Sequence, residues 1–341
     1  MAQEVAVPLE LPEAGPAHMG AGRRALYVAR RNPLGVIGLV CVLSLFACGI
    51  FAGVIAPYDP YQIDGAHLRE APSAAHPFGT DRLGRDVLSR TVHGARISLL
   101  VGLVSVAIGT VAGSFFGILS GYLGKLVDSV IQRAVDVLLA FPAVVLLLAI
   151  ITVIGDEDSA VRKFLANDTP VPTGSFLGVP VFLDIIVIAI GIGIAVAVAT
   201  TRVIRGAVLS IKENVYIDAA RAMGASDWRI MRRHVFPNVA ALIVVLASVS
   251  LPAAILAEAA ISFLGIGVPD PTPSWGADLT GQNRDDALRG IWWVVFFPGL
   301  ALSLVVLGFN MVGDAFRDIS DPRLRGGLGG GSGSGSSRGG L

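Results

Sequence analysis

The sequence predicts an all-α membrane protein with six transmembrane helices, and two properties of the 341-residue chain indicate this fold class. The first is composition: charged residues make up 15% and hydrophobic residues 53% of the chain, whereas soluble domains are about 25% charged. The mean hydropathy is +0.70. The second is charge spacing, because six long intervals contain no Asp, Glu, Lys or Arg. Each interval can cross a hydrocarbon core of about 30 Å as a helix of roughly 17 to 25 residues.

The six intervals define the expected helices. They are residues 32–58, 97–124, 137–155, 185–201, 235–257 and 290–313. The fourth is short, and we expect it to include Val181, Phe182 and Leu183. The resulting organisation is a first transmembrane helix at 32–58, an extracytoplasmic loop at 59–96, a core of five helices at 97–313 that includes a cytoplasmic loop at 202–238, and a C-terminal segment at 314–325. Residues 1–25 are expected to be disordered, and residues 326–341 form a flexible Gly/Ser tail.

Charge placement predicts the orientation of these helices. Placing the N-terminus in the cytoplasm puts 17 of the 26 Lys and Arg residues on the inside, and seven of them lie in the 202–238 loop. An even number of spans returns the C-terminus to the cytoplasm, which makes this a multi-pass protein of the cell membrane. Five arginines in the first outer loop run against the positive-inside rule, by which Lys and Arg are more frequent in cytoplasmic loops. The formal net charge of zero gives no reason to expect a nucleic acid partner.

Small residues predict close helix packing in the second span. Gly109, Gly113, Gly117 and Gly121 recur every fourth residue and form a smooth ridge on one helix face. We interpret this ridge as a packing surface. Trp292 and Trp293 lie where the sixth span leaves the outer interface, as expected for an aromatic belt.

The 202–238 loop has helical structure of its own. Apolar residues at helical spacing between 203 and 211 indicate that the fourth helix continues into the cytoplasm. A short helix from Tyr216 to Met223 then ends at Gly224, which can adopt the left-handed C-cap conformation. Ser226 can cap a further helix over residues 227–234, and Pro237 marks the start of the fifth span. An exposed helix between two capped ends indicates a docking element.

This loop resembles the EAA loop of the membrane permease subunits of ATP-binding-cassette (ABC) importers. That motif reads Glu-Ala-Ala, three residues, Gly, nine residues, then an apolar residue two positions before Leu-Pro. The corresponding residues here are Asp218, Ala219, Ala220, Gly224, His234, Phe236 and Pro237. The chain departs from the pattern with Asp in place of Glu, His in place of the apolar residue and Phe in place of Leu. His234 followed by Pro237 and Asn238 is similar to the peptide-permease version of the loop.

Three further stretches resemble the C-type permeases of dipeptide and oligopeptide importers. Residues 76–90 resemble the region after their first span, residues 258–276 the end of their fifth helix, and residues 321–325 their C-terminus. The resemblance covers roughly residues 25 to 325 and implies a type I ABC importer permease fold.

The resemblance also implies partners. In such importers the short loop helix sits in a groove of an ATPase subunit, a homologous second permease completes the path, and an extracytoplasmic binding protein delivers the cargo. ATP and Mg²⁺ belong to two ATPase subunits, and this chain, which lacks a P-loop pattern, is expected to be no enzyme and to bind no cofactor directly. The candidate coupling residues are Tyr216, Asp218, Ala219, Ala220, Arg221, Gly224, Asp227, His234 and Pro237. Without the motif, the loop would be interpreted as an ordinary solvated basic loop.

Ionisable residues inside the membrane are further candidates, because they are costly and commonly functional. Glu258 lies in the outer part of the fifth span. It could contact a peptide amine in the path or, as we favour, pair with an arginine of the companion permease. Asp136 follows Arg133 by three residues, so the two are expected to pair on one helix face.

The outer loop supplies candidate contacts for a binding protein. Leu83, Val87 and Leu88 are spaced for an interfacial helix over residues 80–96. Asp81, Arg85 and Asp86 are the candidate contact residues, although anchoring to the membrane surface explains this segment equally well. Cys41 and Cys48 are too far apart on one helix to form a disulfide, and no His or Cys cluster indicates a metal site.

The sequence therefore predicts a permease subunit of an ATP-driven importer of di- or oligopeptides. Uptake of a nickel chelate, glutathione or haem stays an alternative within the same family. A secondary transporter driven by protons through Glu258 and Asp136, and a scaffold without transport activity, are alternatives from other classes.

Overall fold

The computed structural model describes residues 32–156, 158–167 and 182–320, and this part of the chain is helical without a named strand. The expectations for residues 1–25, 321–325 and 326–341 lie outside the described residues. The elements are α2 (Pro33–Ile50), α3 (Ala52–Ile55), α4 (Val87–Leu123), α5 (Lys125–Leu139), α6 (Ala143–Gly155), α7 (Ala160–Asn167), α8 (Phe182–Lys212), α9 (Val215–Ala222), α10 (Asp227–Ile230), the π-helical turn η2 (Met231–Val235), α11 (Phe236–Phe263), α12 (Trp275–Asp278), α13 (Gly281–Leu288) and α14 (Trp293–Ser320).

Five described helices are long and apolar enough to cross a membrane. These are Pro33–Ile50, Val87–Leu123, Leu183–Lys212, Asp227–Phe263 and Trp293–Ala315. The pair α5 and α6 makes a sixth if the two helices are counted as one span bent by 101°. The prediction of an all-helical membrane fold is therefore confirmed, with five or six spans.

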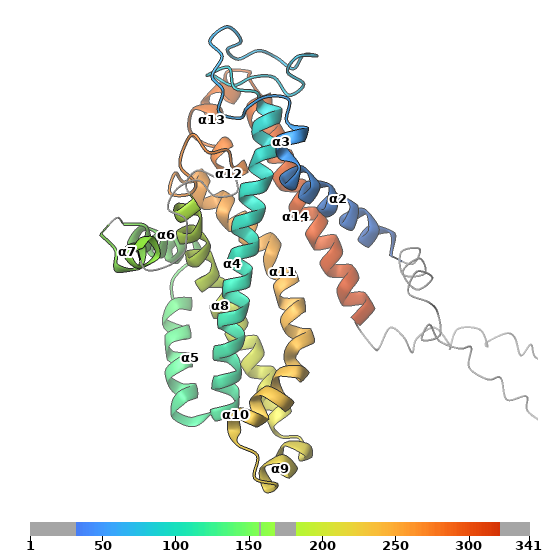
Figure 1. Ribbon diagram of the computed structural model, residues 1–341, viewed down its shortest axis with the longest axis vertical. Coiled ribbons are helices and arrows are strands. Elements are labelled where there is room, and N and C mark those ends of the chain that lie inside the picture. Colours follow the sequence, from blue (N-terminus) through green and yellow to red (C-terminus); the bar gives the residue numbers. More distant parts are fainter. Residues whose placement is uncertain (1–31, 157, 168–181, 321–341) are drawn as a thin grey trace, which may run out of the picture.

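The third predicted span differs from expectation because it is broken. Residues 137–139 end α5, and α6 begins only at Ala143. Pro142 explains the break: it has no N–H to donate to a helix and disfavours helical backbone at the preceding Phe141. Figure 1 shows α5 running beside the lower half of α4, and α6 turning away from it.

The glycine ridge of α4 packs against α8, as predicted. A Cβ atom added at Gly109, Gly113, Gly117 or Gly121 would lie only 2.5 to 2.8 Å from the Cβ atom of an α8 residue. The α8 residues are Val196, Thr200, Ile204 and Val208. The two helices are packed so closely that any side chain on the ridge would push them apart.

The second span begins earlier than predicted. Asp86 is the N-cap of α4, and its side chain accepts a hydrogen bond from the Ser89 N–H at 2.7 Å. No separate interfacial helix forms over residues 80–96, because residues 87–96 are the first turns of α4 itself. Because of this cap and the apolar residues after it, α4 begins at Val87, ten residues before the charge-free interval begins at residue 97.

Two ends of the molecule are distinguished along its long axis (Figure 1). The α9 end consists of residues 213–234 with the adjoining ends of α4 and α8. The α12 end consists of residues 57–90 and 264–292. The charge pattern of the sequence predicts that the α9 end is cytoplasmic. The sites discussed below lie at these two ends, with the α4–α8 pair connecting them.

Candidate functional site

The loop resembling the EAA motif forms a capped helix at the α9 end. Gly224 has a φ of +80°. Its N–H donates to the Arg221 carbonyl at 2.9 Å, and the Ala225 N–H donates to the Ala220 carbonyl at 3.1 Å. These two bonds make a Schellman motif, which confirms the predicted C-cap at Gly224. Since nothing lies within 4 Å of an added Cβ atom there, only the backbone conformation requires glycine.

The helix after this cap runs directly into the fifth span. Ser226 occupies the predicted N-cap position, but its side chain makes no capping hydrogen bond. Residues 227–263 are continuous and include the π-helical turn η2, in which the Phe236 N–H donates to the Met231 carbonyl. Pro237 has no N–H and its ring crowds the preceding turn, so the wider π turn accommodates it. The predicted helix over 227–234 is therefore present, and Pro237 does not interrupt it.

One face of the loop is buried against the spans. Ile217 is 0% and Ala220 is 3% exposed. They belong to an apolar cluster at the inner ends of α4, α8 and α11. Its buried members are Tyr122, Ile204, Val208, Ile217, Ala220, Ile230, Met231, Val235 and Val239. Ala220 therefore packs inside the protein, whereas the neighbouring Asp218 and Ala219 are exposed.

The exposed side of the loop carries several large apolar side chains among its charged ones. Val215 and Met223 are each 82% exposed, Trp228 is 64% exposed and Tyr216 is 43% exposed. We call these four residues together with Ala219 the coupling face. Large apolar side chains grouped on an exposed surface typically mark a protein interaction site. Figure 1 shows that α9 forms the tip of the molecule, where a partner can reach it.

Polar contacts link the remaining predicted residues of the loop. Asp218 and Arg221 form an exposed ion pair at 3.4 Å. Asp227 accepts a hydrogen bond from the Tyr122 hydroxyl at 2.8 Å. The His234 carbonyl accepts one from the Asn238 amide at 2.6 Å. The structure thus brings all nine predicted coupling residues into one continuous segment of α9, α10 and the start of α11.

Glu258 is enclosed by its own chain. It is 0% exposed, and its carboxylate accepts hydrogen bonds from the hydroxyls of Ser98 at 2.8 Å and Ser262 at 2.9 Å. The Val268 N–H in turn donates to the Ser262 oxygen at 3.2 Å. Contact with a peptide or with a companion subunit requires an exposed carboxylate, so neither expected role fits this conformation. Glu258 instead joins α4, α11 and the turn after α11.

The predicted pair of Arg133 and Asp136 is replaced by a different one. Asp136 accepts a hydrogen bond from Arg202 of α8. Sequence spacing predicts partners on the same helix. The turn between α4 and α5 instead places α5 beside the α4–α8 pair, so that Asp136 reaches α8. Close by, Arg205 donates two hydrogen bonds of 2.6 Å to Asp128. These pairs tie α5 to α8.

The three residues predicted to contact a binding protein are buried, since Asp81, Arg85 and Asp86 are only 1 to 4% exposed. Arg85 donates to Asp81 at 2.6 Å. Asp86 lies 3.0 Å from Nδ1 of His76 and caps α4. The outer loop folds back on itself, so its charges find partners within the chain.

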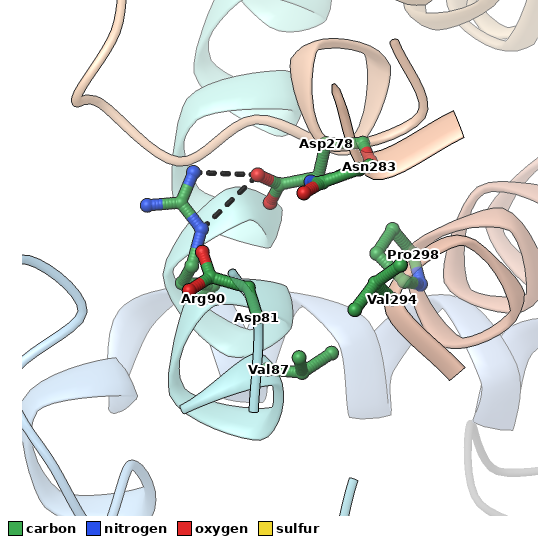
Figure 2. A pocket seen from close by; sticks show the side chains of 7 residues that line it. All are labelled: Asp81, Val87, Arg90, Asp278, Asn283, Val294 and Pro298. Atoms are coloured by element: carbon green, nitrogen blue, oxygen red, sulfur yellow. Dashed lines mark hydrogen bonds and ion pairs between the residues drawn. The ribbon is translucent and has the colours of Figure 1, made fainter. Parts of the chain in front are cut away.

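A buried ion pair at the α12 end was missed by sequence reasoning. Arg90 donates to one oxygen of Asp278 at 2.5 and 3.1 Å and to the Pro271 carbonyl at 3.2 Å. Figure 2 shows this pair, with Asp81 and Asn283, beside a cavity of about 10 Å³, which is the size that one water molecule needs. The available signal was the group of five arginines in the first outer loop, which runs against the positive-inside rule. No group of three or more metal-ligand residues lies close enough to hold a metal ion in the described part of the chain.

The fold and the exposed loop define a multi-pass membrane permease, and comparisons with known proteins place it in a family. Residues 113–326 match the family described as binding-protein-dependent transport system inner membrane component. Residues 21–72 match the N-terminal TM domain of oligopeptide transport permease C. The chain belongs to this permease family. Its members are membrane subunits of ABC importers and have neither catalytic activity nor a bound cofactor of their own.

Relatives cover most of the chain. A dipeptide transport system permease protein DppC of Alkalihalophilus pseudofirmus is 34% identical over 89% of this chain and 90% of its own length. A glutathione transport system permease protein GsiD of Pectobacterium atrosepticum is 38% identical over 86% of this chain and 89% of its own. A di/tripeptide transport system permease protein DppC of Pseudomonas aeruginosa is 37% identical over 84% and 88%. The predicted family is confirmed at the level of peptide and glutathione importers.

Proposed function

We propose that this chain forms half of the translocation path of an importer for di- or oligopeptides. A homologous second permease supplies the other half, two ATPase subunits bind at the α9 end, and an extracytoplasmic binding protein delivers the cargo. The proposal takes the α9 end as cytoplasmic, in agreement with the charge pattern. The observation that carries it is the coupling face, since a capped helix presents large apolar side chains on the protein surface.

The coupling face suits an ATPase groove for two physical reasons. Its apolar side chains gain about 25 cal/mol for each Å² removed from water, which favours association. The face is also fixed to α4, α8 and α11 through the buried side of the same loop, so that movement of the partner displaces the spans. A scaffold would need an exposed face but no such connection.

The cargo proposal rests on the relatives. Two of the three relatives described above are named for dipeptides or di- and tripeptides, and the third is named for glutathione, itself a tripeptide derivative. Small peptides are the substrate class common to these names. A proton-driven mechanism through Glu258 and Asp136 gains no support, because Glu258 is enclosed and Asp136 pairs with Arg202.

Docking is tested by placing a charge on the coupling face. Met223→Asp should abolish copurification of the ATPase subunits with the permease pair. Leu288→Asp at the α12 end is the matched control, because both side chains are 82% exposed, and it should leave the ATPases bound. ATPases retained equally by both variants would contradict docking at this face.

Cargo and energy source are tested in proteoliposomes that contain the whole complex and its binding protein. Uptake of a labelled dipeptide should require internal ATP and should exceed uptake of labelled glutathione. Uptake driven by a pH gradient in the absence of ATPase subunits would overturn the proposal, and a preference for glutathione would correct the cargo.

A further inference from the structure

Tyr122 lies at the point where α4 meets the coupling loop. It occupies the last turn of α4 and is 2% exposed. Its hydroxyl donates a hydrogen bond of 2.8 Å to Asp227 at the start of α10. Its backbone carbonyl accepts a bond of 2.6 Å from the Lys212 ammonium at the end of α8. One residue therefore joins two spans to the loop.

The ring of Tyr122 adds a second set of directional contacts. The Arg221 guanidinium lies 5.4 Å from the ring centre, and the Lys212 nitrogen lies 5.6 Å from it. Both distances fall within the range of cation–π attraction. Arg221 belongs to α9, so that α4, α8, α9 and α10 all contact this side chain. The ring also packs in the buried apolar cluster of the loop.

We propose that Tyr122 is the positioning residue that transmits displacement of the coupling loop to the transmembrane helices. This inference rests on the proposed function and specifies how the same loop acts. Apolar contacts such as those of Ile217 hold the loop against the spans, but they are not directional. The hydrogen bond and the two cation contacts of Tyr122 fix the position of the loop relative to the end of α4.

The displacement can travel onward from Tyr122 by two routes. The glycine ridge locks α4 to α8, so the two helices move as a pair. Two residues before Tyr122, the Ser120 hydroxyl donates to Asp128 of α5 at 2.5 Å, and Asp128 is held by Arg205. Movement of the end of α4 therefore also reaches α5, the first half of the bent pair.

The test separates transport from ATP hydrolysis in the reconstituted complex. Tyr122→Phe removes only the hydroxyl, and Asp227→Asn replaces the charged acceptor with a neutral amide, which weakens the same hydrogen bond. Each should lower the number of peptides imported per ATP by about three- to tenfold, because the net contribution of one hydrogen bond typically corresponds to roughly this factor. ATP hydrolysis and the yield of assembled complex should stay within about twofold of wild type.

The combined variant sharpens this test. If the two changes act on one bond, then Tyr122→Phe with Asp227→Asn should be no worse than Tyr122→Phe alone. Tyr58→Phe is the matched control, because the Tyr58 hydroxyl also donates a single hydrogen bond, at 3.1 Å to the Ala75 carbonyl, but lies at the α12 end. It should leave the number of peptides per ATP unchanged.

Two outcomes would overturn the inference. One is a wild-type number of peptides per ATP in Tyr122→Phe or Asp227→Asn. The other is a parallel fall of uptake, hydrolysis and assembly, which indicates a purely structural residue. Failure of the proposed function is distinct, because the wild-type complex would then show no ATP-dependent uptake in the same assay.

Discussion

The two ends of the molecule use charge in different ways. At the α12 end, the side chains of Arg90 and Asp278 are 4% and 5% exposed, and their ion pair joins the start of α4 to α12. At the α9 end, Arg221 and Asp218 are 38% and 70% exposed and pair within α9. Breaking a buried ion pair is strongly destabilising, whereas an exposed ion pair contributes little to stability. The α12 end is therefore rigid, and the loop at the α9 end can be displaced by a partner.

The tryptophans follow the same division. Trp275 at the α12 end and Trp293 at the adjoining start of α14 are buried, and their ring N–H groups donate to the carbonyls of Thr91 at 2.9 Å and Thr80 at 3.1 Å. Trp293 is thus not part of an aromatic belt as predicted, whereas Trp292 is 51% exposed. Trp228 at the α9 end is exposed and belongs to the coupling face. A tryptophan with a hydrogen bond to the backbone fastens two segments, and an exposed one is available for binding.

The largest expected effect comes from breaking the buried ion pair. Arg90→Leu should lower the free energy of unfolding by about 3–5 kcal/mol, because it leaves the Asp278 carboxylate buried without its partner. Arg284→Leu is the matched control, since Arg284 and Asp285 are 62% and 55% exposed. It should change the stability by less than about 1 kcal/mol. Thermal unfolding in detergent measures both, and equal effects would contradict the proposed rigidity of the α12 end.

Glu258 should rank second. Glu258→Ala should cost about 2–4 kcal/mol, because it leaves a cavity and removes the acceptor for Ser98 and Ser262. Glu258→Gln keeps the shape and one acceptor, and it should cost about 1 kcal/mol or less. Uptake by the Gln variant should follow the amount of folded protein. Loss of uptake by a fully assembled Gln variant would show that the charge itself acts on the cargo.

Sequence reasoning succeeded where the signal is local. Hydropathy located the spans because each must be apolar over its own length, and the spacing of Gly109 to Gly121 revealed a helix face. Gly224 was recognised as a C-cap because that role depends on the conformation of a single residue. The break at Pro142 was also visible locally, but counting charges alone did not use it.

Three of the errors share a different cause, since each concerns a partner distant in sequence. Asp136 finds Arg202, Arg90 finds Asp278, and Glu258 finds Ser98. Spacing on one helix carries no information about which other helix lies alongside. Two of the outer arginines that break the positive-inside rule are explained in the same way, because Arg69 and Arg90 form ion pairs with Asp286 and Asp278, which lie far along the chain. A charge that violates a general rule was the signal of a specific partner.

Substituting one glycine at each end compares the two ends, because both substitutions should cost the same stability. Gly224 and Gly265 have φ values of +80° and +81°, and nothing lies within 4 Å of an added Cβ atom at either. Alanine should cost about 1–2 kcal/mol at each site, because the left-handed conformation is unfavourable for residues with a Cβ atom. Peptide uptake should fall several-fold for Gly224→Ala and follow the small loss of stability for Gly265→Ala. Equal losses of uptake would mean that the cap of α9 has no special part in coupling.

The smallest effect tests whether exposure, rather than the end of the molecule, determines how much a charge contributes. At the α12 end the pKa of His67 is raised above 6.5, chiefly because its ring hydrogen-bonds to Asp64 at 2.9 Å. The contribution to stability is fully present below pH 6.5 and is lost as the pH rises through the raised pKa. Asp64→Asn should return the pKa of His67 towards 6.5 in an NMR titration, whereas Asp59→Asn should leave it unchanged. Since the two side chains are 46% and 42% exposed, the unfolding temperature should barely respond. A large change would show that this end is stabilised by its exposed charges as well as by its buried ones.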